Sequence, residues 1–207
     1  MKHTKRSKYS TAFSAGALLF KESEAIVNSI IDEEAFIRGD ETIDYECIPV
    51  NSDASKKRLR TEVVTRLRNL GDPHFMKIYK NGTKEDKLLI LFYAACKTYR
   101  LITDFMIDTV LDKWYHMDYE LSNADYKNYH FRQMDKHEEL KDNSTLLIKK
   151  LSNVTLRMLV ELGMLKENKL QKQQYNHSIL AQIAASGDAW FLEVLLLNKE
   201  ERNEILS

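Results

Sequence analysis

Cysteine, histidine and glycine are the residues of this sequence best placed to build a reactive centre, and their spacing argues against one. Cys96 lies in the apolar run 88–96, where the pKa of a thiol rises and its reactivity falls. His137 is followed by two glutamates but lacks the second histidine, four positions later, that a zinc protease helix requires. The six glycines are too far apart for a phosphate-binding loop. We therefore expect no enzyme activity, no metal, no cofactor and no small-molecule substrate.

A second kind of chemistry, contact with a polyanion, is indicated by a basic helix expected over residues 144–162. Lys150, Asn153 and Arg157 follow the i, i+3, i+7 spacing of one helical face, and Lys149 aligns with Asn153 at i+4. Long cationic side chains around an amide suit phosphate contacts combined with hydrogen bonds to base edges. These four residues are our first candidates for contacts with double-stranded DNA. The alternative, an ordinary solvated helix face, stays open because exposed lysines are common.

An earlier helix, expected to start at Ser55 and run to about residue 70, carries a similar basic flank. Lys57, Arg60 and Arg68 lie on one side of a helical wheel, beside a narrow apolar stripe. We predict that these three residues contact DNA phosphates. The alternative is that they pair with the acidic block at residues 22–53.

The segment after the basic helix has the pattern of a small hairpin. Gly163 ends the helix, and two short segments of alternating character, 164–166 and 169–171, surround a polar turn. A helix followed by a basic hairpin is typical of a winged helix-turn-helix module, whose helix enters the major groove while the hairpin touches the DNA backbone. The sequence therefore suggests a winged-helix-like segment over 122–172. The alternative, an amphipathic helix followed by an irregular linker, stays open.

These segments belong to a chain whose composition favours helices. Its 207 residues include only six Gly and two Pro, which disfavours a turn-rich β-sandwich. We predict a mostly all-α fold: a compact helical globule with helix-turn-helix-like elements and a short β-hairpin wing near residues 164–172. An N-terminal helical part would cover 1–80 and a C-terminal helical part 81–207, together forming one compact unit.

Specific expectations for single elements follow from capping and apolar patterns. We expect a first helix from Ser10 or Ser14 to about residue 31 and a looser acidic stretch over 39–55. Thr83 and Asp86 predict a capping box for a long apolar helix that reaches Trp114 and that has room for a break near residues 97–100.

Charge is balanced overall but segregated along the chain. Thirty-one Lys and Arg match 31 Asp and Glu, yet residues 1–8, 56–70 and 143–174 are basic while 22–53 and 101–142 are acidic. Such blocks can present basic faces to a polyanion and acidic faces to proteins, or they can pair with one another in the fold. The longest apolar run has nine residues, too few to span a membrane. Two cysteines without a leader segment fit the reducing cytoplasm.

Several segments of the chain resemble the BrxA family of small accessory proteins from bacterial BREX (bacteriophage exclusion) systems. The resemblance covers most of residues 9–171, and this chain departs from the family pattern in the acidic stretch 39–53. It rests on Tyr9–Leu19 with Glu22, Arg66–Leu70, Tyr99–Phe105, Ser144-Thr145 and Leu156–Leu165.

The resemblance implies a helical cytoplasmic protein without enzymatic activity that binds double-stranded DNA and other BREX subunits. A protein-interaction adaptor, whose acidic blocks recruit a basic partner without binding nucleic acid, is the alternative. RNA binding is a weaker option, because no run of exposed aromatic residues with basic neighbours marks a single-strand platform.

Overall fold

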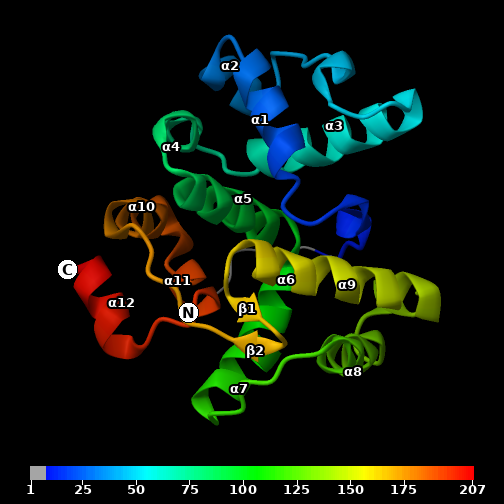
Figure 1. The fold of residues 1–207 in the computed structure, drawn as a ribbon, viewed down its shortest axis with the longest axis vertical. Coiled ribbons are helices and arrows are strands. Elements are labelled where there is room, and N and C mark those ends of the chain that lie inside the picture. Colours follow the sequence, from blue (N-terminus) through cyan, green and yellow to red (C-terminus); the bar gives the residue numbers. More distant parts are fainter. Residues whose placement is uncertain (1–7) are drawn as a thin grey trace.

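The computed structural model describes residues 8–207 and shows a mostly helical protein, as the composition predicts (Figure 1). The described residues hold one two-stranded sheet. No helix among them is long and apolar enough to cross a membrane. The fold class expected from the sequence is therefore confirmed. The expected basic block at 1–8 lies outside the described residues except for Lys8.

The first part of the chain forms short helices around one longer one. Its acidic stretch 39–52 is mostly loop around one 3₁₀ turn. The elements are η1 (Ala12–Ala15), α1 (Phe20–Ser29), α2 (Glu33–Arg38), η2 (Tyr45–Cys47), α3 (Asp53–Arg68) and α4 (His74–Asn81).

The second part begins with the central helix and ends with short helices that pack back onto it. Its elements are α5 (Lys84–Thr98), α6 (Arg100–Phe105), the π-helical turn η3 (Met106–Leu111), α7 (Asp112–Tyr115), α8 (Asn123–Met134), η4 (Glu138–Leu140), α9 (Thr145–Glu161), β1 (Leu165–Lys166), β2 (Lys169–Leu170), α10 (His177–Ile183), η5 (Ala184–Asp188), α11 (Phe191–Val194) and α12 (Lys199–Leu206).

Helix α5 forms the centre of the core and contacts both parts of the chain. Thr83 and Asp86 form the predicted capping box at its start. Residues 89–96 are buried on every side, because α3, α4 and α6 pack around the helix. Phe191 of α11 closes the remaining side, with its ring centroid 5.0 Å from that of Tyr93. The long helix predicted to reach Trp114 breaks at Tyr99, in the interval where the sequence left room for a break.

The prediction of a single first helix from Ser10 or Ser14 to residue 31 is wrong. The chain forms the turn η1, then an extended turn over 16–19, and only then α1. Leu19 adopts a positive φ of 54°, and its side chain lies so close to Gly16 that a Cβ there would meet it at 2.4 Å. Arg66 of α3 explains the break: its guanidinium donates to the carbonyl oxygens of Gly16, at 3.0 Å, and Ala17.

Candidate nucleic-acid interface

Helix α9 carries the first group of predicted DNA contacts. Ser144 caps its N-terminus by accepting a hydrogen bond from the amide of Leu147 at 3.2 Å. Its core side is buried by α8 and η1, whereas one arc remains in solvent. We call this arc the α9 face; its exposed residues are Leu146, Lys149, Lys150, Asn153, Arg157 and Val160. The structure thus places Lys149, Lys150, Asn153 and Arg157 on one surface.

The cations of the α9 face differ in how they are engaged. Lys149 and Lys150 are exposed, and their side chains make no hydrogen bond or ion pair with any described residue. The Arg157 side chain is 75% exposed, and its Nε donates to Glu161 Oε1 at 3.0 Å. The other oxygen of Glu161 accepts the amide of Leu18 at 3.0 Å. Two ammonium groups are therefore available to an anion, and the guanidinium of Arg157 keeps donors beyond the one that Glu161 uses.

Two apolar members of the α9 face escaped the sequence analysis. Leu146 is 77% exposed and Val160 is 54% exposed, although large aliphatic side chains are usually buried. A helical wheel could have indicated their exposure, because both positions fall outside the apolar stripe and among the basic residues. An aliphatic side chain beside cations suits contact with the methyl group of thymine in a major groove.

The hairpin predicted near 164–172 is confirmed and follows α9 directly. Gly163 has a φ of 81°, which ends the helix. β1 and β2 then pair antiparallel, with Lys166 opposite Lys169. Glu167 and Asn168 both have positive φ (50° and 61°), the backbone of a type I′ turn. Both lysines of the hairpin are exposed.

A third short segment, residues 119–121 just before α8 in the chain, pairs with this hairpin. Glu120 forms an isolated bridge with Lys169. The amide of Leu121 donates to the carbonyl of Asn168 at 2.8 Å, and the amide of Leu170 donates to the carbonyl of Tyr119 at 2.7 Å. The order along the chain is thus strand segment, α8, α9, β1, β2. The connection between α8 and α9 runs from residue 135 to 144 and contains η4.

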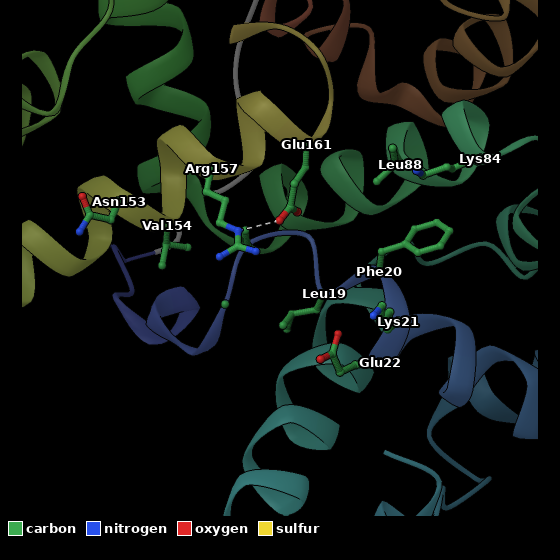
Figure 2. Close-up of a pocket in the computed structure, with 12 residues that line it drawn as sticks. Leu19, Phe20, Lys21, Glu22, Lys84, Leu88, Asn153, Val154, Arg157 and Glu161 are labelled. Carbon is green, nitrogen blue, oxygen red and sulfur yellow. Dashed lines mark hydrogen bonds and ion pairs between the residues drawn. The ribbon is translucent and has the colours of Figure 1, made fainter. Parts of the chain in front are cut away.

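An open groove of about 710 Å³ lies beside the α9 face, on the side away from the hairpin. Asn153 and Arg157 of α9 form one wall, and Lys21 of α1 and Lys84 of α5 belong to the opposite wall (Figure 2). Leu19 and further apolar side chains contribute to its lining.

The second group of predicted DNA contacts, on α3, does not form a comparable surface. Arg60 Nε donates to the carbonyl of Ile43 at 2.8 Å. Arg68 donates to the carbonyls of Phe36 at 2.9 Å and Glu41 at 2.6 Å. Lys57 is exposed, and its ammonium lies 5.0 Å from the ring centroid of Tyr45. The two arginines thus hold the segment 36–43 on α3 through its carbonyl groups.

Over residues 8–207, the two cysteines and the potential metal ligands do not form a reactive centre. Burial raises the pKa of the Cys96 thiol, and burial with the charge of Asp44 raises that of Cys47. A raised thiol pKa opposes formation of the reactive thiolate. Over residues 8–207, no group of three or more His, Cys, Asp or Glu side chains is arranged to hold a metal ion.

Fold and surface together define a mostly helical protein whose exposed basic helix leads into a short hairpin. The family model BrxA matches residues 7–187, so the chain belongs to the BrxA family. A relative from Bacillus cereus (strain H3081.97), BREX protein BrxA, is 25% identical over 199 residues, which cover 93% of this chain and 98% of the relative.

A solved structure shares the fold. It is the crystal structure of an uncharacterized protein from Magnetospirillum magneticum, which matches with a TM-score of 0.74 and 17% sequence identity. The match covers 91% of this chain and 98% of that one.

Proposed function

We propose that this protein is a non-enzymatic, double-stranded DNA-binding accessory component of a BREX phage-defence system, acting in the cytoplasm. Membership of the BrxA family and the relative named BREX protein BrxA support the assignment to that system. The non-enzymatic part of the proposal is supported by the two thiols, because their raised pKa values oppose the use of Cys96 or Cys47 as a nucleophile. Its partners would be duplex DNA and other BREX subunits, with no membrane and no small-molecule substrate.

The observation that carries the DNA-binding proposal is the α9 face. It combines two unengaged lysines, Asn153 and the exposed side chain of Arg157 on one helical surface that leads into a lysine-bearing hairpin. The order of strand segment, helix, helix and hairpin is that of a winged helix-turn-helix. In this interpretation α9 is the recognition helix and β1–β2 the wing. The ten residues between α8 and α9 exceed the usual turn of three or four.

The proposed contacts divide by chemistry. Lys149, Lys150 and Arg157 supply positive charge for phosphates, which gives affinity without sequence preference. Asn153 lies between them with an amide suited to a base edge. Arg60 and Arg68 are assigned to the fold instead, because their guanidinium groups donate to backbone carbonyls.

An adaptor function remains the second candidate, favoured by an exposed apolar group at the end of α7. Tyr115, Met117 and Tyr119 are exposed there, beside the carboxylates of Asp112 and Asp118. A basic partner protein with apolar side chains would be complementary to this surface. In that case the chain would co-purify with other defence subunits and would not retain DNA at moderate salt.

Charge reversal on the α9 face tests the proposal. We expect the double variant Lys150→Glu, Arg157→Glu to bind duplex DNA at least roughly tenfold more weakly in a gel-shift titration, because two phosphate contacts become repulsive. Lys149→Ala, Lys150→Ala, which leaves the pair of Arg157 with Glu161 intact, should show a smaller loss.

The matched control reverses two exposed lysines elsewhere, Lys77→Glu on α4 and Lys199→Glu on α12. It changes the net charge by the same amount as Lys150→Glu, Arg157→Glu and should retain most of the affinity. Equal affinity of the wild type and both α9 variants would exclude this face.

A further inference from the structure

The groove beside the α9 face provides a second set of cations that the proposed function does not use. Lys21 and Lys84 come from helices far from α9 in the sequence, yet they line the same groove as Asn153 and Arg157 (Figure 2). Both lysines are exposed, and neither side chain makes a hydrogen bond or ion pair with another residue in the described range 8–207. Lys84 sits in the first turn of α5, where a cation is unfavourable for the helix dipole. Its position is thus not explained by helix stability.

The wall that carries Lys21 is held in place from two directions. Arg66, which is only 3% exposed, binds the carbonyl oxygens of Gly16 and Ala17 from α3. Glu161 accepts the amide of Leu18 from the side of α9. The turn that precedes α1 is therefore tied to both α3 and α9, so the spacing across the groove is preformed.

The carboxylates of the groove leave its rim positive. Three cations, Lys21, Lys84 and Arg157, face two carboxylates, Glu22 and Glu161. The oxygens of Glu161 are already engaged by Arg157 and by the amide of Leu18. Glu22 lies in the first turn of α1, where an acid is favourable for the helix dipole.

Duplex geometry connects this rim with the α9 face. A helix seated in a major groove about 12 Å wide has a sugar–phosphate backbone on each side. On one side of α9, Val160 and the hairpin residue Lys166 line a common pocket, which places the wing there. On the other side lies the groove with Lys21 and Lys84.

We propose that one sugar–phosphate backbone of a duplex seated on the α9 face spans this groove, and that Lys21 and Lys84 bind its phosphates. The proposal rests on the proposed function and extends it: the N-terminal helix α1 and the start of α5 become part of the DNA-binding surface. The duplex then contacts both parts of the chain rather than the winged-helix segment alone.

The test compares the salt dependence of duplex binding in two matched double variants. Lys21→Ala, Lys84→Ala removes the proposed phosphate ligands, whereas Lys77→Ala, Lys199→Ala removes the same charge from α4 and α12, which lie away from α9 (Figure 1). Binding of a labelled duplex two helical turns long is followed by fluorescence anisotropy over a series of salt concentrations. The slope of log K against log salt is negative. We expect Lys21→Ala, Lys84→Ala to make this slope less negative by about 2, one unit for each phosphate that no longer has a lysine beside it. Lys21→Arg, Lys84→Arg should restore it.

Each other outcome has a distinct meaning. If both alanine variants bind more weakly by the same factor, net charge explains the effect and the proposed contacts are wrong. If Lys21→Ala, Lys84→Ala binds like the wild type while Lys150→Glu, Arg157→Glu does not, the inference fails and the proposed function stands. A wild-type protein that shows no salt-dependent duplex binding would overturn both.

Discussion

Buried polar side chains decide the local geometry at the residue scale. Arg66 and Glu62 are 3% and 6% exposed, and Arg66 Nε donates to Glu62 Oε1 at 2.6 Å. The hydroxyl of Tyr99 donates to the same carboxylate at 2.8 Å. Because Arg66 also holds the carbonyls of Gly16 and Ala17, this network fixes the turn that borders the groove. Removal of Arg66 or Glu62 would leave a buried charge without its ionic partner, which typically costs about 3–5 kcal/mol.

His130 of α8 is a second buried polar side chain, and it should make stability depend on pH. Burial lowers its pKa from 6.5 to about 4, and the Asn143 amide donates to its Nε2 at 3.1 Å, which favours the neutral ring. The unfolded chain binds this proton at a higher pH than the folded chain does. The free energy of unfolding should therefore fall by about 3 kcal/mol as the pH decreases from 6.5 to about 4.

Comparison with His130→Gln isolates this contribution. Denaturant unfolding at a series of pH values should show a shallower fall over this range for the variant than for the wild type. Asp108, whose pKa is raised by burial, acts in the opposite direction but is present in both proteins. Parallel curves for the two proteins would mean that His130 is accessible to protons in the folded state.

At the scale of elements, local sequence signals predicted most helices and tertiary contacts decided the exceptions. Thr83 and Asp86 marked the start of α5, since the hydrogen bonds of a cap join residues two or three positions apart, and the basic helix expected from residue 144 begins there as α9. The helix expected to start at Ser55 begins at Asp53. The break between η1 and α1 depends on Arg66 and Glu161, which lie about 50 and 143 positions further along the chain. No local pattern contains that information.

The same distinction separates the two groups of predicted site residues. Helical spacing placed Lys149, Lys150, Asn153 and Arg157 together because all four lie on one helix. Helical spacing could not show that Arg60 and Arg68 donate to the backbone of a loop, because every residue has a carbonyl group and the pattern of charged residues does not identify which carbonyls act as partners.

Arg68 should therefore contribute to the attachment of an element rather than to DNA binding. It donates two hydrogen bonds to the carbonyls of Phe36 and Glu41, and its guanidinium lies 5.2 Å from the centroid of the Phe36 ring. We expect Arg68→Ala to lower the free energy of unfolding by about 2 kcal/mol, since two partly buried carbonyls lose a charged donor.

Two measurements on Arg68→Ala check this assignment. Thermal or denaturant unfolding gives the stability loss, and a duplex titration gives the salt slope. The slope should equal that of the wild type under conditions where the variant is fully folded. A slope that is less negative by about 1, without a loss of stability, would instead support the phosphate contact first predicted for Arg68.

At the scale of the whole molecule, a chain with no net charge must bind a polyanion through the placement of its charges. Thirty-one bases balance 31 acids. Many of these pair within the fold, such as Lys97 with Asp188 at 2.7 Å and Lys80 with Glu33 at 2.6 Å. Lys149 and Lys150 of the α9 face and Lys21 and Lys84 across the groove have no such carboxylate partner among the described residues. The segregated charge blocks are thus partly cancelled in the fold and partly displayed, which combines both interpretations of the sequence pattern.

The most direct test of the account is a salt-dependent titration of the wild-type protein against duplex DNA, single-stranded DNA and RNA in parallel. We predict that duplex DNA binds best and that log K falls linearly with log salt, with a slope of about −3 or steeper from the cations of the α9 face. Duplex binding that is absent at moderate salt, or that does not change with salt, would contradict the account and leave the adaptor function as the explanation of the chain.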